Sequence, residues 1–481
     1  MTQPHIPIYR FGSVYESLDT TTIDDFRGTT QTATVSQANP GMIRRDMKKI
    51  GKAFAALQNR GTDEMIAIAK EAGRLFMEGT LPVDSSTSHS PEDYATTLSA
   101  NSGLPLTLVR GNMEKVAYML THVEEVIHGL TRGLDHAVID RGIAEQDGLL
   151  MSFFPDTHSL GAVLPSNSPG VNSLWIPAVV LRIPVVLKPG REDPWTPWRI
   201  IQAFLAAGCP PEAFGFYPTS HEGAAEVLNQ CGRALVFGDQ STVEKYAGDS
   251  GVSAHGPGWS KVIIAEDQAD NWEDYVDVCV DSIVRNGGRS CVNASCVVIP
   301  RNGRALADAI AAKLATVLPT RLDDPEARLA ATANPRMADF LEQTLEQALK
   351  APGATDLTAP ARGTPVRTEV DGATFIQPTL VWCDDRTHTL ANTEFLMPYA
   401  SVVEVPQEEL FTWIGPTLVG TIITEDPAVR QAAIACPHID RLNLGPLPTP
   451  TVRWDQPHEG NLFEFLYRRR AIQESDGAPA A

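Results

Sequence analysis

The amino-acid sequence predicts an α/β protein in which helices cover parallel β-sheets. Two observations support this class: strand-like and helix-like segments alternate from about residue 149 to 264, and a second alternating block runs from about 271 to 437. Such alternation is typical of parallel sheets with helices on both faces. At 481 residues the chain is also longer than one hydrophobic core usually serves, so we expect two or three domains.

Within the first block, short β-rich runs are separated by helical ones. Strands are expected at residues 158–164, 183–187, 214–217, 233–237 and 260–264, and helices at about 170–181, 194–207 and 242–248. The second block is expected to hold a helix at 271–285, a strand at 296–299, helices at 304–318 and 335–350, a loop at 351–368 and a β-rich segment at 373–381. Parallel sheets of this kind bind nucleotides at the carboxyl ends of their strands.

The flanking segments differ in character. Residues 1–40 are expected to be extended, and apolar residues at three- and four-residue steps predict helices from about 42 to 79 with a break at Gly61. Further helices are expected at 91–102 and 106–134. Near the end, the apolar and aromatic segment 461–467 predicts a strand that pairs with another subunit, because it cannot close a sheet of its own.

Composition restricts the possible partners. The net charge of −20 argues against nucleic acid and anionic membrane surfaces. No apolar run approaches the ~20 residues that a bilayer requires, and residues 1–19 carry no secretory signal. Seven cysteines at irregular spacing predict neither a disulfide framework nor a metal site, so a cytoplasmic protein is expected.

The segment from Asn286 to Cys291 (NGGRSC) is the strongest candidate for a reactive site. Its glycines allow the backbone to approach a ligand closely. A cysteine reacts as a thiolate, and the charge of nearby Arg289 is expected to lower the pKa of the thiol. The alternative is that Arg289 faces solvent. A buried, inert Cys291 in a turn is the alternative, because free cysteines are most often core residues.

Five segments in order resemble signatures of the aldehyde dehydrogenase superfamily: 164–169 (LPSNSP), 186–189 (VLKP), 286–291 (NGGRSC), 372–379 (GATFIQPT) and 394–398 (EFLMP). The resemblance spans roughly residues 110 to 470. It implies two Rossmann-like parallel-sheet domains, one cofactor-binding and one catalytic, plus a small β oligomerisation extension in a homodimer or homotetramer. The implied domains are 1–136 with 156–258 (NAD(P)-binding), 259–440 (catalytic), and 137–155 with 455–475 (oligomerisation strands).

The resemblance also implies a chemistry, the NAD(P)-dependent oxidation of a small-molecule aldehyde. Cys291 would attack the carbonyl carbon, and Asn167 with the backbone N–H of Cys291 would stabilise the oxyanion where its charge develops. Loss of hydride to the cofactor would leave a thioester on Cys291, which divides one difficult reaction into two. Lys188 is implied as a contact to the adenosine ribose and Glu394 as a contact to the nicotinamide ribose.

Other implied cofactor contacts leave the choice between NAD and NADP open. Pro165 and Gly258 belong to the matching turn and glycine loop. Arg191 lies where many NAD-preferring members have an acidic residue, and an arginine there suits a 2′-phosphate, whereas neighbouring Glu192 suits a ribose hydroxyl. Ser241 is expected at a helix start, where N–H groups can bind a pyrophosphate; a simple helix cap is the alternative.

One departure from the family concerns release of the acyl group. Hydrolytic members carry a glutamate that activates water, whereas the corresponding residues 254–260 (AHGPGWS) contain no carboxylate. The Gly-Pro-Gly segment resembles the acylating branch, in which coenzyme A takes the acyl group or, in the reverse reaction, an acyl-CoA is reduced. Release to water is the other outcome that the resemblance allows. His255 is a possible substitute base because its unperturbed pKa is near neutral, or it lies in a glycine loop without a catalytic role. A second hypothesis is a catalytically impaired member that acts as a binding or structural subunit.

Overall fold

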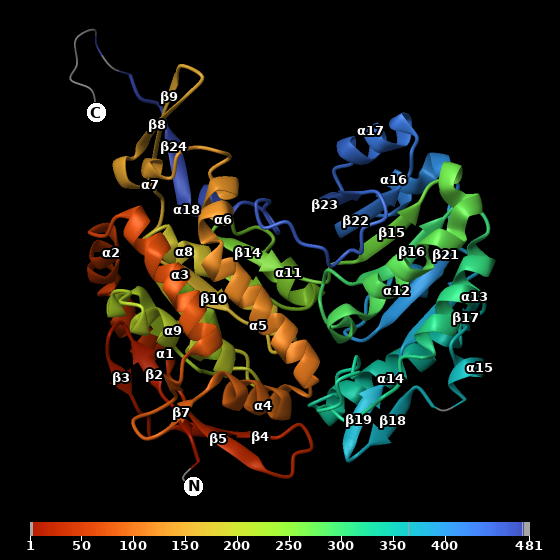
Figure 1. The fold of residues 1–481 in the computed structure, drawn as a ribbon, viewed down its shortest axis with the longest axis horizontal. Coiled ribbons are helices and arrows are strands. Elements are labelled where there is room, and N and C mark those ends of the chain that lie inside the picture. The colour runs from red at the N-terminus through yellow and green to blue at the C-terminus, as the bar shows by residue number, and fades with distance from the viewer. Residues whose placement is uncertain (1–2, 364, 474, 476–481) are drawn as a thin grey trace.

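The computed structural model describes residues 3–363, 365–473 and 475. The chain forms two lobes, each built around a seven-stranded sheet, and a three-stranded sheet projects from the first lobe (Figure 1). Helices cover the faces of both large sheets, so the fold class is the predicted α/β class. Residues 1, 2, 364 and 474, which fall within predicted segments, lie outside the described residues.

The first large sheet has the order β14-β13-β10-β11-β12-β2-β3. Its parallel strands are β10 (Leu160–Val163), β11 (Val185–Lys188), β12 (Phe214–Phe216), β13 (Arg233–Phe237) and β14 (Val252–His255), and β2 (Ile8–Arg10) and β3 (Val14–Tyr15) extend it antiparallel. After β10 the chain continues to β11 on one side and later to β13 on the other. The boundary between β10 and β13 is therefore the switch point at which α/β sheets bind ligands.

The helices of the first lobe follow from local signals. Asn39 caps the first of them by accepting from the backbone N–H of Met42, and Ser90 and Asp93 form a capping box at the start of the predicted 91–102 helix. The helices are α1 (Pro40–Met47), α2 (Ile50–Gln58), α3 (Thr62–Glu78), α4 (Pro91–Ser102), α5 (Leu106–Thr121), α6 (Val123–Leu130), α7 (Ala137–Arg141), α8 (Ile176–Val180), α9 (Trp195–Ala206), α10 (His221–Gln230) and α11 (Gln240–Tyr246).

The second large sheet has the order β17-β20-β21-β16-β15-β22-β23 and is parallel except at β17. Its strands are β15 (Ser260–Ile264), β16 (Ala294–Ile299), β17 (Ala354–Asp356), β20 (Thr379–Cys383), β21 (Tyr399–Glu404), β22 (Thr417–Ile423) and β23 (Ile439–Leu444). The helices around it are α12 (Val276–Val284), α13 (Gly303–Leu314), α14 (Pro335–Leu349), α15 (Ala359–Arg362), α16 (Leu410–Trp413) and α17 (Pro427–Ala435).

The projecting sheet corrects one prediction. Segment 461–467 is not a strand that lacks a partner: Leu462–Leu466 form helix α18, which Asn461 caps by accepting from the N–H of Glu464. The strand begins only at β24 (Tyr467–Arg470), and it pairs antiparallel with β9 (Leu149–Pro155) of the same chain, which pairs with β8 (Ile143–Gln146). The terminal strand therefore completes a sheet within its own subunit.

Several further expectations differ from the structure. The loop expected at 351–368 contains β17 and α15, and the helix expected at 106–134 is divided into α5 and α6. The expected helical region 42–79 breaks between α1 and α2 as well as at Gly61. Residues 254–260 are not a loop throughout, because β14 continues to His255 and pairs with β13 at Phe237. The remaining strands are β1 (His5–Ile6), β4 (Thr20–Asp24), β5 (Gln31–Ser36), β6 (Leu81–Pro82), β7 (Ser88–His89), β18 (Arg367–Val370) and β19 (Ala373–Ile376). Within the described part of the chain, none of the helices has the length and apolarity to cross a bilayer.

Candidate active site

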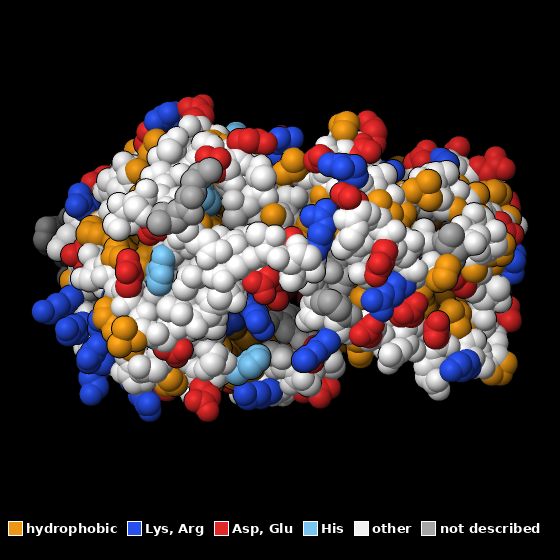
Figure 2. Space-filling model, turned by 90° about the horizontal axis from the view of Figure 1, so that it is seen from below, with side chains coloured by type: hydrophobic (Ala, Val, Ile, Leu, Met, Phe, Trp, Pro, Cys, Tyr) orange, Lys and Arg blue, Asp and Glu red, His pale blue; other side chains and the backbone are white. Residues whose placement is uncertain are grey.

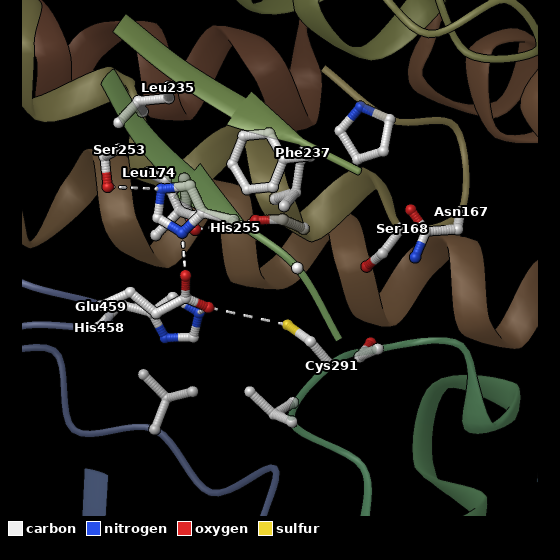
Figure 3. A pocket seen from close by; sticks show the side chains of 18 of the residues that line it. Asn167, Ser168, Leu174, Leu235, Phe237, Ser253, His255, Cys291, His458 and Glu459 are labelled. Carbon is white, nitrogen blue, oxygen red and sulfur yellow. Dashed lines mark hydrogen bonds and ion pairs between the residues drawn. The ribbon is translucent and has the colours of Figure 1, made fainter. Parts of the chain in front are cut away.

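A cavity of about 1050 Å³ lies between the two lobes. The first lobe contributes the loops after β10 and β13, at the switch point of its sheet, and the end of β14. The second lobe contributes the Cys291 loop and the segment that begins at Glu394. The returning chain after β23 closes one side (Figure 3). The lining includes residues 165–168, 237–239, 255–257, 290–292, 394–396 and 456–462.

The backbone before Cys291 is folded tightly. Asn286, Gly287 and Gly288 have positive φ angles of 57°, 67° and 66°, a region that favours glycine. A Cβ on Gly288 would lie 2.4 Å from the backbone nitrogen of Pro398, so a larger residue cannot fit there. These residues turn the chain after α12 and present Cys291 to the cavity.

The glycine loop of the first lobe packs directly against the nucleophile segment. A Cβ on Gly258 would lie 1.9 Å from the backbone oxygen of Cys291. That oxygen also accepts a hydrogen bond of 2.8 Å from Ser260 Oγ. Gly258, predicted as a cofactor contact, therefore allows a close backbone approach that fixes the position of Cys291.

Asn167 lies in the same cavity as Cys291. Its Nδ2 donates a hydrogen bond of 2.7 Å to the backbone oxygen of Arg289. A side-chain amide carries two N–H donors, so this bond uses one of them and orients the other. The predicted nucleophile and oxyanion donor are thus brought together by loops of different lobes.

The predicted effect of Arg289 on the thiol is wrong. Its guanidinium donates to the backbone oxygens of Ser102, at 3.1 Å, and Ala331, and burial lowers its pKa to about 10. Burial, together with the negative charge of Glu394, instead raises the pKa of Cys291 to about 12. Arg441 is the cation that opposes this rise, so the thiol needs a base to ionise.

Glu394, predicted as a contact to the nicotinamide ribose, lines the cavity, and the glycine loop binds its carboxyl group. Its Oε2 accepts a hydrogen bond of 2.6 Å from the backbone N–H of Trp259. Burial raises the pKa of Glu394 to about 7, although the N–H groups of Trp259 and Gly258 and the cation of Lys261 oppose the rise. The carboxyl group can therefore change charge near neutral pH.

The structure adds a carboxylate that the sequence analysis missed. Oε1 of Glu459 lies 3.9 Å from Cys291 Sγ, and Oε2 contacts Nδ1 of His255 (Figure 3). His255 and Glu459 are 204 residues apart, and no spacing rule connects them. Only the knowledge that the chain after β23 returns to the first lobe would have identified Glu459 as a candidate.

His458 completes a group of three possible metal ligands, with Cys291 and Glu459, whose ligand atoms lie within 4.8 Å of one another. Nη1 of Arg441 lies 2.9 Å from Nδ1 of His458, and an arginine only donates. Nδ1 is therefore the acceptor, and Nε2 carries the ring proton and has no lone pair for a metal. Burial and the Arg441 cation lower the pKa of His458 to about 3. The ring of His458 is therefore not disposed to bind a metal together with Cys291 and Glu459.

Not all predicted cofactor residues reach the cavity. Pro165 lines the cavity. Lys188 ends β11 at the carboxyl edge of the sheet, and burial lowers the pKa of its side chain. Arg191 is exposed and lines a separate cavity of about 330 Å³, whereas its neighbour Glu192 lines both. Ser241 donates to Asp239 at 2.7 Å, and Asp239 caps α11, so this carboxylate occupies the helix start.

On the face shown in Figure 2, acidic and basic side chains are scattered over both lobes, and Lys and Arg side chains gather at its left edge. The titratable side chains described above instead gather inside the cavity between the lobes. The cavity is therefore the candidate active site.

Three solved structures illustrate the likeness of the fold. The aldehyde dehydrogenase KauB from Pseudomonas aeruginosa is 17% identical, with a TM-score of 0.81 over 98% of this chain and 97% of that one. An NAD+ complex of an aldehyde dehydrogenase from Bacillus cereus is 16% identical, with a TM-score of 0.77 over 97% and 96%. An NADP-dependent enzyme from E. coli is 16% identical, with a TM-score of 0.77 over 97% of both chains.

No curated protein sequence matches the chain. The family model described as "Aldehyde dehydrogenase family" matches residues 29–420. This match starts well before the segments on which the sequence resemblance rests, so most of the N-terminal helices are included. The model covers far more than half of the sequence, and the chain therefore belongs to the aldehyde dehydrogenase family.

Proposed function

We propose that this enzyme oxidises an aldehyde with a nicotinamide cofactor through a thioester on Cys291. The observation that carries the proposal is the shared cavity, which is lined by both Cys291 and Asn167 and also reaches the switch point between β10 and β13. A catalytically impaired binding subunit has no need for this arrangement. Reactive thiol, oxyanion donor and nucleotide-binding edge together support catalysis.

The residues at the switch point suit a dinucleotide. Pro165 and Ser166 follow β10, Gly238 follows β13, and all three line the cavity. When bound there, the cofactor would supply the hydride acceptor. Solved structures with the same fold include an NAD+ complex and an NADP-dependent enzyme, which supports the assignment of this edge to NAD(P).

The chain's own residues then have defined tasks. The thiolate of Cys291 forms a bond to the carbonyl carbon, and the second N–H of Asn167 with the backbone N–H of Cys291 stabilises the oxyanion. Because the thiol has a raised pKa, its proton must pass to a nearby base. After oxidation, the acyl group remains on Cys291 until a nucleophile releases it.

The position of Glu192 supports NAD rather than NADP. Glu192 lines the main cavity, and its backbone N–H donates to Ser166 Oγ at 3.1 Å, which holds it beside the loop after β10. A carboxylate there accepts from a ribose hydroxyl and repels a 2′-phosphate. Arg191 lies outside the main cavity. Glu192→Gln should lower the ratio of kcat/KM for NAD+ to kcat/KM for NADP+. Arg191→Ala should leave this ratio nearly unchanged.

The far side of the cavity suits an aldehyde with an apolar body. Its lining there is mainly aliphatic and aromatic, with Met119, Val126, Leu130, Leu174, Trp454, Leu462 and Phe465. Burying apolar substrate surface against such side chains stabilises the complex by roughly 25 cal/mol per Å². A panel of straight-chain aldehydes should therefore show kcat/KM rising with chain length.

The function is tested with the purified full chain. Incubation with an aldehyde and NAD+ should produce NADH and an acyl adduct on Cys291 that mass spectrometry detects. Cys291→Ser should abolish both signals, while Cys436→Ser, which alters another partly exposed cysteine, should not. A wild-type protein that forms neither NADH nor an adduct with any aldehyde would support the binding-subunit alternative instead.

We also propose that the projecting sheet contributes to a homodimer or homotetramer. Its order β24-β9-β8 leaves β24 at an edge, with Arg468, Arg469 and Arg470 exposed. Edge strands offer unpaired backbone groups to another chain. Light scattering should give a dimer or larger assembly, and Arg469→Pro should reduce its size by removing a backbone donor from this edge.

A further inference from the structure

Glu459 stands between the nucleophile and a histidine of the first lobe (Figure 3). Its Oε1 lies 3.9 Å from Sγ of Cys291, and its Oε2 contacts Nδ1 of His255. Nε2 of the same ring lies 3.2 Å from Ser253 Oγ. The Glu459 side chain is 16% exposed, so its carboxylate remains in contact with the open cavity.

The protonation of His255 follows from its surroundings. Burial lowers its pKa to about 4, so the ring is neutral near pH 7. A neutral ring donates from one nitrogen and accepts at the other, and an ionised carboxylate only accepts. Nδ1–H therefore donates to Glu459, and Nε2 accepts from Ser253 Oγ. His255 is too weak a base to act itself, but it holds the carboxylate.

His255 is further fixed by the strands around it. It is the last residue of β14, paired with Phe237 of β13, and the two rings stack with centroids 4.7 Å apart. A ring held on a strand and against another ring has little freedom to rotate. The carboxylate of Glu459 is consequently directed with Oε1 towards Cys291.

We propose that Glu459 is the general base that activates water against the thioester on Cys291, and that His255 is the residue that positions it. The inference rests on the proposed function, because it requires an acyl group on Cys291. The inference specifies the acceptor of the acyl group: water takes it, and coenzyme A is not needed. The carboxylate that is missing from residues 254–260 is thus replaced from a distant part of the chain.

The step balances without an oxidant. The Glu459 carboxylate takes a proton from water while the hydroxyl oxygen bonds to the acyl carbon. The tetrahedral species collapses, the carbon–sulfur bond breaks, and Cys291 leaves as a thiolate. The proton on Glu459 then passes to the thiolate across the 3.9 Å contact, so that thioester and water yield a carboxylic acid and the free thiol.

Glu394, another carboxyl group that lines the cavity, is less suited to this task. The Glu394 carboxyl group accepts from the Trp259 N–H at 2.6 Å and also from the N–H of Gly258, so the glycine loop holds it. Burial also raises its pKa to about 7, so a large fraction is protonated near neutral pH. Glu459 has one oxygen on His255 and the other facing the sulfur.

The test measures release directly, apart from the redox step. The acyl group is placed on Cys291 of the full chain with a p-nitrophenyl ester, and loss of the acyl mass is followed at neutral pH. Glu459→Gln should release it about 100-fold more slowly than the wild type, within the range for a general base. Glu464→Gln is the matched control, because Glu464 lies in the same segment and binds Arg132 at 2.6 Å.

Hydroxylamine distinguishes a lost base from a damaged site, because it brings its own nucleophile. It should remove the acyl group from Glu459→Gln and from the wild type at equal rates. Wild-type release rates in Glu459→Gln would overturn the proposal. So would slow release that hydroxylamine fails to restore, or wild-type release that requires coenzyme A. The proposed function fails separately if the wild type makes no NADH from aldehydes although its acyl group is hydrolysed through Glu459.

Discussion

The Nδ2 of Asn167 donates a hydrogen bond of 2.7 Å to the backbone oxygen of Arg289. Asn167 follows β10 of the first lobe, and Arg289 belongs to the loop of the second lobe that carries Cys291. One side-chain amide thus joins the two walls of the cavity and leaves its second N–H donor free of this bond. The oxyanion site proposed above would therefore draw on both lobes.

Asn167→Ala should slow acylation of Cys291 about 10²- to 10³-fold, the loss typical of removing one oxyanion donor. Asn167→Asp keeps the size but replaces the N–H donors with negative charge, and it should be at least as slow. Release of p-nitrophenol from a p-nitrophenyl ester measures acylation without a cofactor. Asn229→Ala, on the exposed side of α10, is the control and should acylate at the wild-type rate. Equal rates for the Asn167 and Asn229 variants would contradict the assignment.

Gly258→Ala should displace the backbone of Cys291. The added methyl group would lie 1.9 Å from the Cys291 oxygen, which is backbone and cannot rotate away. Overpacking of this kind costs about 1–3 kcal/mol, so thermal unfolding should move to lower temperature and acylation should slow. Gly248→Ala is matched to it, since a Cβ there meets nothing within 4 Å. A Gly258→Ala protein with wild-type stability and acylation would refute the close approach.

His255→Asn should preserve release of the acyl group better than His255→Ala, because an asparagine N–H can still donate to Glu459. If His255 only filled space, the two variants would release the acyl group at the same rate. Since burial holds the pKa of His255 at about 4, the release rate should show no inflection from this imidazole between pH 5.5 and 7.5. An inflection near 6.5 that disappears in both variants would make His255 the base and would remove the positioning role.

The sequence predicts those parts of the enzyme in which neighbours along the chain decide the outcome. The tight segment before Cys291, the strand ends near Pro165 and Lys188, and helix α4 all carry local signals. Prediction from the sequence fails where tertiary packing determines the position of a side chain. Arg289 is near Cys291 in sequence, yet its guanidinium binds the backbone oxygen of Ala331. The carboxylate nearest to the Cys291 thiol belongs to Glu459, which a returning segment brings into the cavity.

The prediction of the terminal strand is wrong for a related reason. Segment 461–467 has the apolar and aromatic composition of a strand, but the Asn461 cap starts helix α18 within it. The strand partner, β9, precedes β24 by more than three hundred residues, as the 318-residue separation of the Arg470–Ser152 hydrogen bond shows. Spacing along the sequence cannot reveal a pairing at that distance.

Glu394 should make the stability of the apoprotein depend on pH. Its pKa is 4.5 in an unfolded chain and about 7 in the folded one, so the native state holds the proton more tightly. This stabilisation is fully present below pH 4.5 and is lost as the pH rises to about 7. Compared with Glu394→Gln, the wild type should therefore lose up to about 3 kcal/mol of unfolding free energy across that window. Glutamine keeps an oxygen for the Trp259 N–H but does not titrate, and denaturant unfolding of both proteins at several pH values gives the difference. If the free energies of unfolding of the two proteins changed in parallel with pH, Glu394 would be solvated rather than buried against the glycine loop.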